Sequence, residues 1–188
     1  TQTGASATLS ITVTTAPNTA PVLAGLQAMP ALREDAATNP GLSVSALVAG
    51  QITDPDAGAL SGVAVIGTGA TGGRWEASLD GGSTWSSIGA PTPATARLLP
   101  ADGLARIRFV PDANWNGVSP ALQMRAWDQT GGTSGQTTAD ASSGGGTTAF
   151  STATASVTVT VAAVNDAPVL TGSLPAAPSF VQGAAPAD

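Results

Sequence analysis

The feature that most constrains this chain is a strand-like run that ends in a short polar motif followed by proline. Residues 156–161 alternate Ser or Thr with Val, and this period of two is typical of a β-strand with one buried face. The run continues into Asn165-Asp166-Ala167-Pro168. Proline fixes its own φ angle and has no N–H to donate to a sheet, so we expect the strand to end before Pro168.

The same motif occurs near the start of the chain. There the alternating residues 8–13 are followed by Asn18-Thr19-Ala20-Pro21-Val22-Leu23, which matches residues 165–170 except that Thr19 stands where the later copy has Asp166. The spacing of about 150 residues is the length of a whole domain. The sequence therefore predicts a section of a tandem array, with the last strand of one repeat at 1–17, a complete repeat at 18–166, and a linker and the start of the next repeat at 167–188.

Short apolar runs bounded by turn residues predict an all-β, antiparallel β-sandwich. No stretch of ten or more residues keeps the apolar spacing of an amphipathic helix, whereas Val/Ile/Thr runs between Gly, Pro, Asn and Asp recur throughout. The Gly-, Ser- and Thr-rich residues 130–146 are expected to form a mobile loop. The expected strands lie at 22–29, 42–48, 62–67, 73–79, 84–88, 96–99, 104–110, 122–127 and 150–161.

One pair of these strands has the signature of an inserted hairpin. Asp80-Gly81 lies between two alternating runs, 73–79 and 84–88, and Asp-Gly in this position strongly favours a tight turn. We expect Trp75 and Trp85 to face each other across the hairpin. The pattern Ser78-x-Asp80-x-Gly82-x-Thr84-Trp85 also resembles the Asp-box of sialidases. We interpret it as a self-stabilised turn, in which the Asp80 carboxylate accepts backbone N–H groups.

Three motifs together give the chain a family resemblance. Val164-Asn165-Asp166-Ala167-Pro168 resembles the linker between cadherin repeats, Asp54-Pro55-Asp56-Ala57-Gly58 resembles the acidic loop after the second strand, and Ala126-Trp127-Asp128-Gln129-Thr130-Gly131 resembles the stretch before the last strand. The chain is therefore similar to the cadherin-like, Ig-like extender repeats of large secreted, RTX-type bacterial adhesins. The resemblance implies a cadherin-like sandwich that binds Ca²⁺ between repeats, in a protein that is secreted or held on the bacterial cell surface.

The topology of a sandwich sorts the acidic and amide side chains into two groups, one at each end. Loops of such a fold alternate between its ends, so we expect one group at the N-terminal end and the other at the C-terminal end. Ca²⁺ takes six to eight oxygen ligands, and these side chains supply them. Ordinary turn-forming roles would also account for any one of these residues. The expected ligands are Asn18, Asp54, Asp56 and Asp128 at the N-terminal end, and Glu34, Asp35, Asp112, Asn165 and Asp166 at the C-terminal end.

Composition excludes several other classes of function. The formal net charge is −6 and no Lys is present, which excludes the basic surface of a nucleic-acid-binding protein. No apolar run reaches the length needed for membrane insertion. Because Cys, His, Lys and Tyr are all missing, a Ser nucleophile would lack its usual base, and we expect no enzymatic activity.

Two hypotheses of function follow. The first is a calcium-stiffened structural extender that spaces the adhesive domains of a bacterial surface adhesin from the cell, with neighbouring repeats of the same polypeptide as its partners. The second is a ligand-binding module of the same kind of adhesin, which would hold a glycan or peptide of a cell surface through the tryptophan hairpin.

Overall fold

The computed structural model describes residues 16–172 and confirms the prediction of an antiparallel β-sandwich. Two four-stranded sheets form its layers. In spatial order, the first sheet contains β12 (Ala155–Val157), β11 (Leu122–Trp127), β5 (Gly62–Gly67) and β8 (Arg97–Pro100). The second contains β3 (Leu42–Ser43), β9 (Arg106–Pro111), β6 (Gly73–Ser78) and β7 (Ser86–Ser87).

Short strands complete the fold at its two ends. β1 (Val22–Leu23) pairs with β4 (Ile52–Thr53), and β13 (Thr160–Ala162) lies between β10 (Gly117–Val118) and β2 (Leu32–Arg33). The pairing of β13 with β2 is parallel, whereas the other strand pairs of the described chain are antiparallel. A single 3₁₀ turn, η1 (Pro93–Thr95), precedes β8.

The main hydrophobic core lies between the two large sheets. Alternate residues of β5 and β11, such as Val63, Val65 and Met124, point into it from one side, and Trp75 and Phe109 point into it from the other. The rings of Trp75 and Phe109 meet edge to face, with their centroids 5.4 Å apart. This alternation follows from the strand period of two.

The remaining residues of β5 are buried as well, because a long segment covers the outer face of its sheet. Residues 130–146, expected to form a mobile loop, instead pack Ala139 and Ala141 against Ala64 and Leu98, and Phe150 joins the same cluster. Backbone hydrogen bonds hold this segment to η1 and β8, including Ala96 N–H to the Ala139 carbonyl at 2.7 Å. Burial on both faces explains why β5 reads as a continuous apolar run rather than an alternating one.

The strand expected over residues 42–48 is wrong beyond Ser43. The chain turns there into a short helix, α1 (Val44–Leu47), and the Ser43 hydroxyl accepts the Ala46 N–H at 3.2 Å as its N-cap. Val44 and Leu47, three residues apart, are both buried, which matches one face of a helical turn. The Ser residues that gave the alternating pattern serve as a cap and an outward-facing position instead.

The predicted hairpin is present as β6 and β7, and its two strands are part of the second large sheet. β9 pairs along all of β6, so Trp75 lies opposite Phe109. The expected contact between Trp75 and Trp85 is wrong, because the register pairs Glu76 with Ser87 and leaves Trp85 in the turn.

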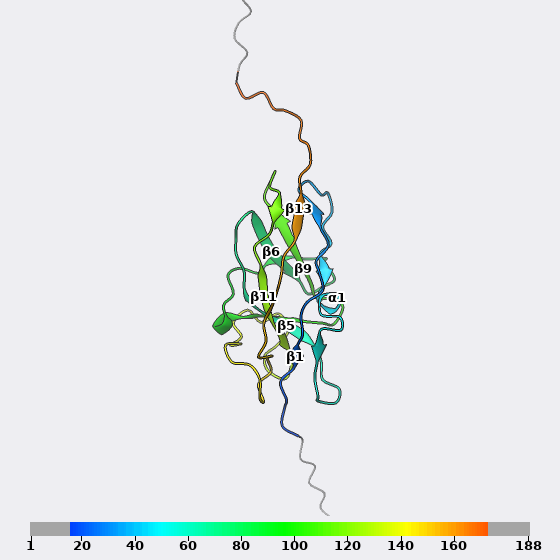
Figure 1. Ribbon diagram of the computed structural model, residues 1–188, viewed down its shortest axis with the longest axis vertical. Helices are drawn as coiled ribbons and strands as arrows, with labels where there is room; N and C mark the ends of the chain where they lie inside the picture. Colours follow the sequence, from blue (N-terminus) through cyan, green and yellow to red (C-terminus); the bar gives the residue numbers. More distant parts are fainter. Residues whose placement is uncertain (1–15, 173–188) are drawn as a thin grey trace, which may run out of the picture.

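The chain enters at one end of the domain and leaves at the other (Figure 1). The run expected to be one long last strand is divided, since β12 pairs with β11 in the first sheet while β13 pairs with β10 and β2. At the change of sheet, Ser119 N–H donates to the Val159 carbonyl and Val159 N–H donates to the Ser119 hydroxyl, both at 2.9 Å. Among the described residues, no helix is long and apolar enough to cross a membrane.

Candidate cation sites at the two ends of the domain

At the N-terminal end, the chain is tied to two acidic loops by consecutive residues. The Asn18 side-chain amide donates to Asp128 Oδ2 at 2.8 Å and to the Thr148 carbonyl at 3.2 Å. The next residue, Thr19, donates its backbone N–H to Asp56 Oδ2 at 2.7 Å. The structure thus brings Asn18, Asp56 and Asp128, which are far apart in the sequence, to the same end of the sandwich.

Asp54 adds an oxygen that the described chain leaves without a partner. Its Oδ1 accepts the Asp56 N–H at 2.9 Å, which folds residues 54–56 into an Asx turn. Its Oδ2 is buried and has no hydrogen-bond partner among the described residues. A buried carboxylate oxygen without a donor is unfavourable, and a bound cation would satisfy it.

Asp128 is the most buried of the expected ligands, with only 2% of its surface exposed. Its Oδ1 accepts the Thr130 N–H at 2.8 Å and the Thr130 hydroxyl at 2.6 Å, while Asn18 donates to Oδ2. These three donors compensate the buried charge. Asp128 therefore acts as the anchor to which the incoming chain is fastened.

At the C-terminal end, three carboxylates meet. Glu34, Asp35 and Asp166 each offer a carboxylate oxygen, and these atoms all lie within 4.8 Å of one another. Glu34 follows β2, and its N–H bonds to the Ala162 carbonyl at 3.1 Å, which extends the pairing with β13. Because β13 leads directly to the departing chain, this pairing places Asp166 beside Glu34 and Asp35.

Glu34 also holds the departing chain through hydrogen bonds. Its Oε1 accepts the Val164 N–H at 2.6 Å, and its Oε2 accepts the Asn116 side-chain amide at 3.2 Å. Asn165 is exposed next to Asp166, and its side-chain amide contacts the Asp166 carbonyl at 3.5 Å. The departing segment 164–166 is therefore held against the body of the domain through the Glu34 side chain.

Asp112 does not join this group. It is exposed just after β9, and its backbone bonds to the Gly72 carbonyl and the Trp115 N–H shape the turn that follows. The three-carboxylate cluster of the described chain consists of Glu34, Asp35 and Asp166 without it.

Among the described residues, only the C-terminal end brings three carboxylates within 4.8 Å of one another. Its donor set is chemically suited to a hard cation. It consists of carboxylate, amide and backbone oxygens, with no His or Cys in the chain to favour a softer metal. Oxygens on opposite sides of a bound Ca²⁺ are about 5 Å apart, twice the usual Ca–O distance. Three C-terminal oxygens this close together can therefore contact one ion.

The Asp80 turn is stabilised by its own side chains. The Asp80 carboxylate accepts the Thr84 hydroxyl at 2.6 Å, the Thr84 N–H at 2.8 Å and the Ser78 hydroxyl at 2.7 Å. These hydrogen bonds, those from Thr84 above all, lower the pKa of Asp80 to about 2. The Trp85 indole N–H donates to the Gly82 carbonyl at 2.9 Å, and the Arg108 guanidinium lies 4.0 Å from the centre of its ring.

An ion-pair network that the sequence did not indicate lies on the outer face of β6 and β9. Glu76 Oε1 accepts from Arg74 at 2.7 Å, and Glu76 Oε2 accepts two N–H groups of Arg108 at 2.7 and 2.9 Å. Burial opposes ionisation of Glu76, but the hydrogen bonds and charges of Arg108 and Arg74 outweigh it, so its pKa is lowered. Only the alternation of Arg106 and Arg108 along the strand could have hinted at this face.

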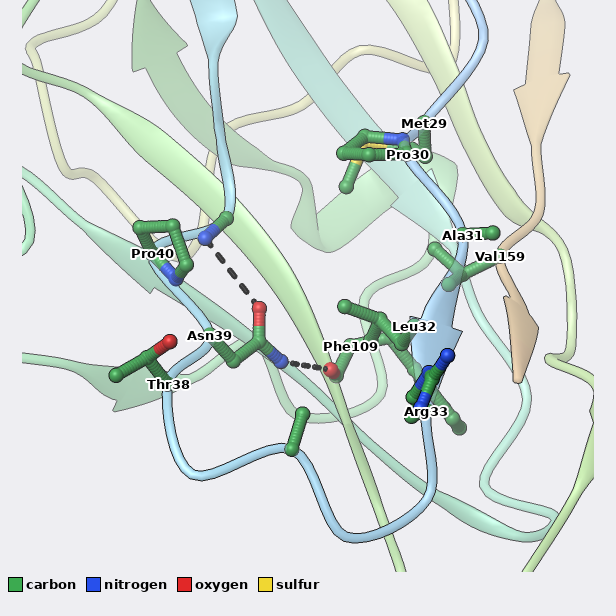
Figure 2. Close-up of a pocket in the computed structure, with 12 residues that line it drawn as sticks. Met29, Pro30, Ala31, Leu32, Arg33, Thr38, Asn39, Pro40, Phe109 and Val159 are labelled. Carbon is green, nitrogen blue, oxygen red and sulfur yellow. Dashed lines mark hydrogen bonds between the residues drawn. The ribbon is translucent and has the colours of Figure 1, made fainter. Parts of the chain in front are cut away.

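A hollow of about 300 Å³ opens beside β2, where the loop 33–41 diverges from the sandwich (Figure 2). Its lining is mostly apolar and includes Met29, Leu32 and Phe109. The Asn39 side chain crosses it, donating to the Phe109 carbonyl at 2.7 Å and accepting the Gly41 N–H at 3.3 Å. None of the described residues that line the hollow is acidic, so its chemical character differs from that of the two ends.

Comparison with protein-family models, with curated proteins and with solved structures gives no match to this chain.

Proposed function

We propose that this domain is a calcium-binding structural repeat that transmits a fixed direction from one neighbouring repeat to the next. The observation that carries the proposal is that each acidic end includes the segment through which the chain enters or leaves. Asn18 and Thr19 bond to Asp128 and Asp56 at one end, and Asp166 lies beside Glu34 and Asp35 at the other.

A cation would act on the flexibility of these segments. Without one, Glu34, Asp35 and Asp166 repel one another, and this repulsion opposes the hydrogen bond by which Glu34 holds the departing chain. When bound, Ca²⁺ supplies a positive charge that neutralises them. At the other end, the support for a cation is the unpartnered buried Oδ2 of Asp54, since among the described residues Asp54, Asp56 and Asp128 do not form a group as close as the C-terminal one.

The wider setting of the proposal is a cadherin-like extender in a secreted or surface-anchored bacterial adhesin. Its support is the order of the three motifs along the chain and the β-sandwich on which they lie. A chain without Cys has no disulfides to stabilise it outside the cell, and a ligand that binds only the folded state supplies that stability. We propose no catalytic role.

A calcium titration followed by thermal unfolding tests the proposal. At free Ca²⁺ of about 100 times Kd, one site adds about 2.7 kcal/mol to the free energy of unfolding. Asp166→Ala should reduce this gain, and Asp112→Ala, which removes a nearby charge from outside the cluster, should leave it unchanged. A Tm that is the same in excess chelator and in millimolar calcium would eliminate calcium binding.

The alternative, a module that binds a glycan or peptide through the tryptophan hairpin, gains no support from the tryptophans. Trp75 and Trp127 are buried in the two cores, with 2% and 1% of their surfaces exposed. Trp115 packs edge to face on Phe109, and Arg108 covers a face of Trp85. These contacts leave the rings already partnered within the domain, so we do not put this alternative forward.

A further inference from the structure

The tetrapeptide Ala-Pro-Val-Leu occurs at residues 20–23 and again at 167–170, and its two copies are in different environments. Ala20, Pro21 and Leu23 are buried against the domain, and β1 pairs with β4. In the second copy, Ala167, Pro168 and Leu170 are exposed, and Leu170 exposes 70% of its surface where Leu23 exposes 5%. Because residues 20–23 pack against the domain that follows them, we expect residues 167–170 to pack in the same way against a domain that follows them.

The first copy shows which contacts the second one lacks. Asn18 donates to Asp128, Thr19 N–H to Asp56, and Ala20 N–H to the Gly146 carbonyl at 2.9 Å. Leu23 then lies opposite Ile52 in the β1–β4 pair. By the sequence match, Asn165, Asp166, Ala167 and Leu170 occupy the corresponding positions.

We propose that residues 167–170 begin a second domain of this fold, with 169–170 as the counterpart of β1, and that this domain sits directly against the C-terminal end of the first with no free linker residue between them. Val164 N–H is bound to Glu34 of the first domain. The very next side chain, Asn165, is the counterpart of Asn18, and its amide is bound to the second domain's counterpart of Asp128. Two adjacent residues are thus held by two different bodies.

This arrangement aligns the domains by hydrogen bonds, even in the absence of cations. A hinge needs residues whose φ and ψ angles are free to change, and here each residue from 164 to 167 is bound on one side or the other. The inference rests on the proposed tandem role of the domain but not on calcium, which adds to an alignment already present.

The test is a tandem protein in which residues 16–166 are followed directly by residues 20–172. The junction is seamless because Ala20-Pro21-Val22-Leu23 repeats residues 167–170. The chain has no Cys, so one spin label can be placed on Cys substituted for Ala37 in the first copy and one on Cys substituted for Ala57 in the second. Both positions are exposed. The same two labels within a single domain give the distance distribution of a rigid body for reference.

In excess chelator, we expect the distribution of distances between the two labels across the junction to be as narrow as the reference distribution from a single domain. Asn165→Ala and Glu34→Ala should each broaden it, whereas Glu34→Gln should not, since the amide oxygen still accepts the Val164 N–H. A distribution that is broad in chelator and narrow in calcium would overturn this inference and leave the calcium proposal standing. One that is broad in both would overturn both. A narrow distribution unaffected by Asn165→Ala and Glu34→Ala would also overturn the inference.

Discussion

Replacing Asp35 by Asn should stabilise the domain without calcium and lose that advantage when calcium is present. Asp35 is exposed and shares the C-terminal cluster with Glu34 and Asp166. Asn has nearly the same shape as Asp, so the substitution removes a charge and little else. Its effect therefore measures the repulsion within the cluster.

The magnitude follows from the spacing of the carboxylates. Two unit charges at the upper limit of 4.8 Å in water repel by about 0.9 kcal/mol, and closer charges repel more strongly. A Debye length of about 8 Å at physiological ionic strength reduces this to about 0.5 kcal/mol per pair. Asp35 takes part in two pairs, so its neutralisation should raise the free energy of unfolding by about 1 kcal/mol. In a domain of this size, that corresponds to a rise in Tm of about 2–4 °C.

Calcium reverses the balance. At free Ca²⁺ of about 100 times the Kd of the unmodified protein, the gain is about 2.7 kcal/mol, and a variant that binds ten times more weakly gains only about 1.4 kcal/mol. The loss of about 1.3 kcal/mol offsets the relief of repulsion. Thermal unfolding of both proteins, in chelator and in calcium, measures the four stabilities.

Asp112→Asn is the matched control, because it makes the same change of charge outside the cluster. Its stability should stay within about 0.5 kcal/mol of the unmodified protein in both conditions. If Asp35→Asn lowers the Tm in chelator, or shifts it equally with and without calcium, the repulsion argument is wrong.

Three further predictions concern groups whose partners are fixed by the structure. Because the pKa of Asp80 is lowered, its hydrogen bonds with Thr84 stabilise the fold at pH values above 3.8, and this stability is lost as the pH falls through about 2. NMR titration of the Asp80 carboxyl carbon should give a midpoint of about 2, and a midpoint near 3.8 would contradict the prediction. Asp128→Ala leaves three donors unpaired, including the Asn18 amide, and should lower the free energy of unfolding by about 2–3 kcal/mol in denaturant titrations. Asp128→Asn should lower it less, and an equal loss of stability in the two variants would refute the role of the Asp128 oxygens as acceptors. Ser43→Ala removes the cap of α1 and should cost about 1 kcal/mol, and an unchanged unfolding midpoint would show that the cap contributes nothing.

The large sheets could be predicted because their strands carry strong local signals. Gly62–Gly67 and Leu122–Trp127 are strands over the predicted residues. The turn at Asp80 was found from Asp-Gly between alternating runs. α1 was missed because Ser at 43 and 45 gives a period of two, while the helical turn depends on where the chain must change direction.

The placement of side chains at the two ends was partly accessible, since a sandwich returns alternate loops to the same end. Asn18, Asp56 and Asp128 meet at one end, and Glu34, Asp35 and Asp166 meet at the other. Partners that belong to the backbone could not be predicted from residue types. The Val164 N–H that holds Glu34 is one of these, because every non-proline residue carries the same donor.

The parallel pairing of β13 with β2 has a consequence for a chain under tension. Force applied along the long axis of the domain runs along β13 toward the departing end, parallel to the strand (Figure 1). The backbone hydrogen bonds between β13 and β2 are then loaded together in shear, instead of being unzipped one after another. Survival of a pulled domain depends on its rate of unfolding rather than on its equilibrium stability. Under such a load, the two short strands at the C-terminal end would act as a mechanical clamp.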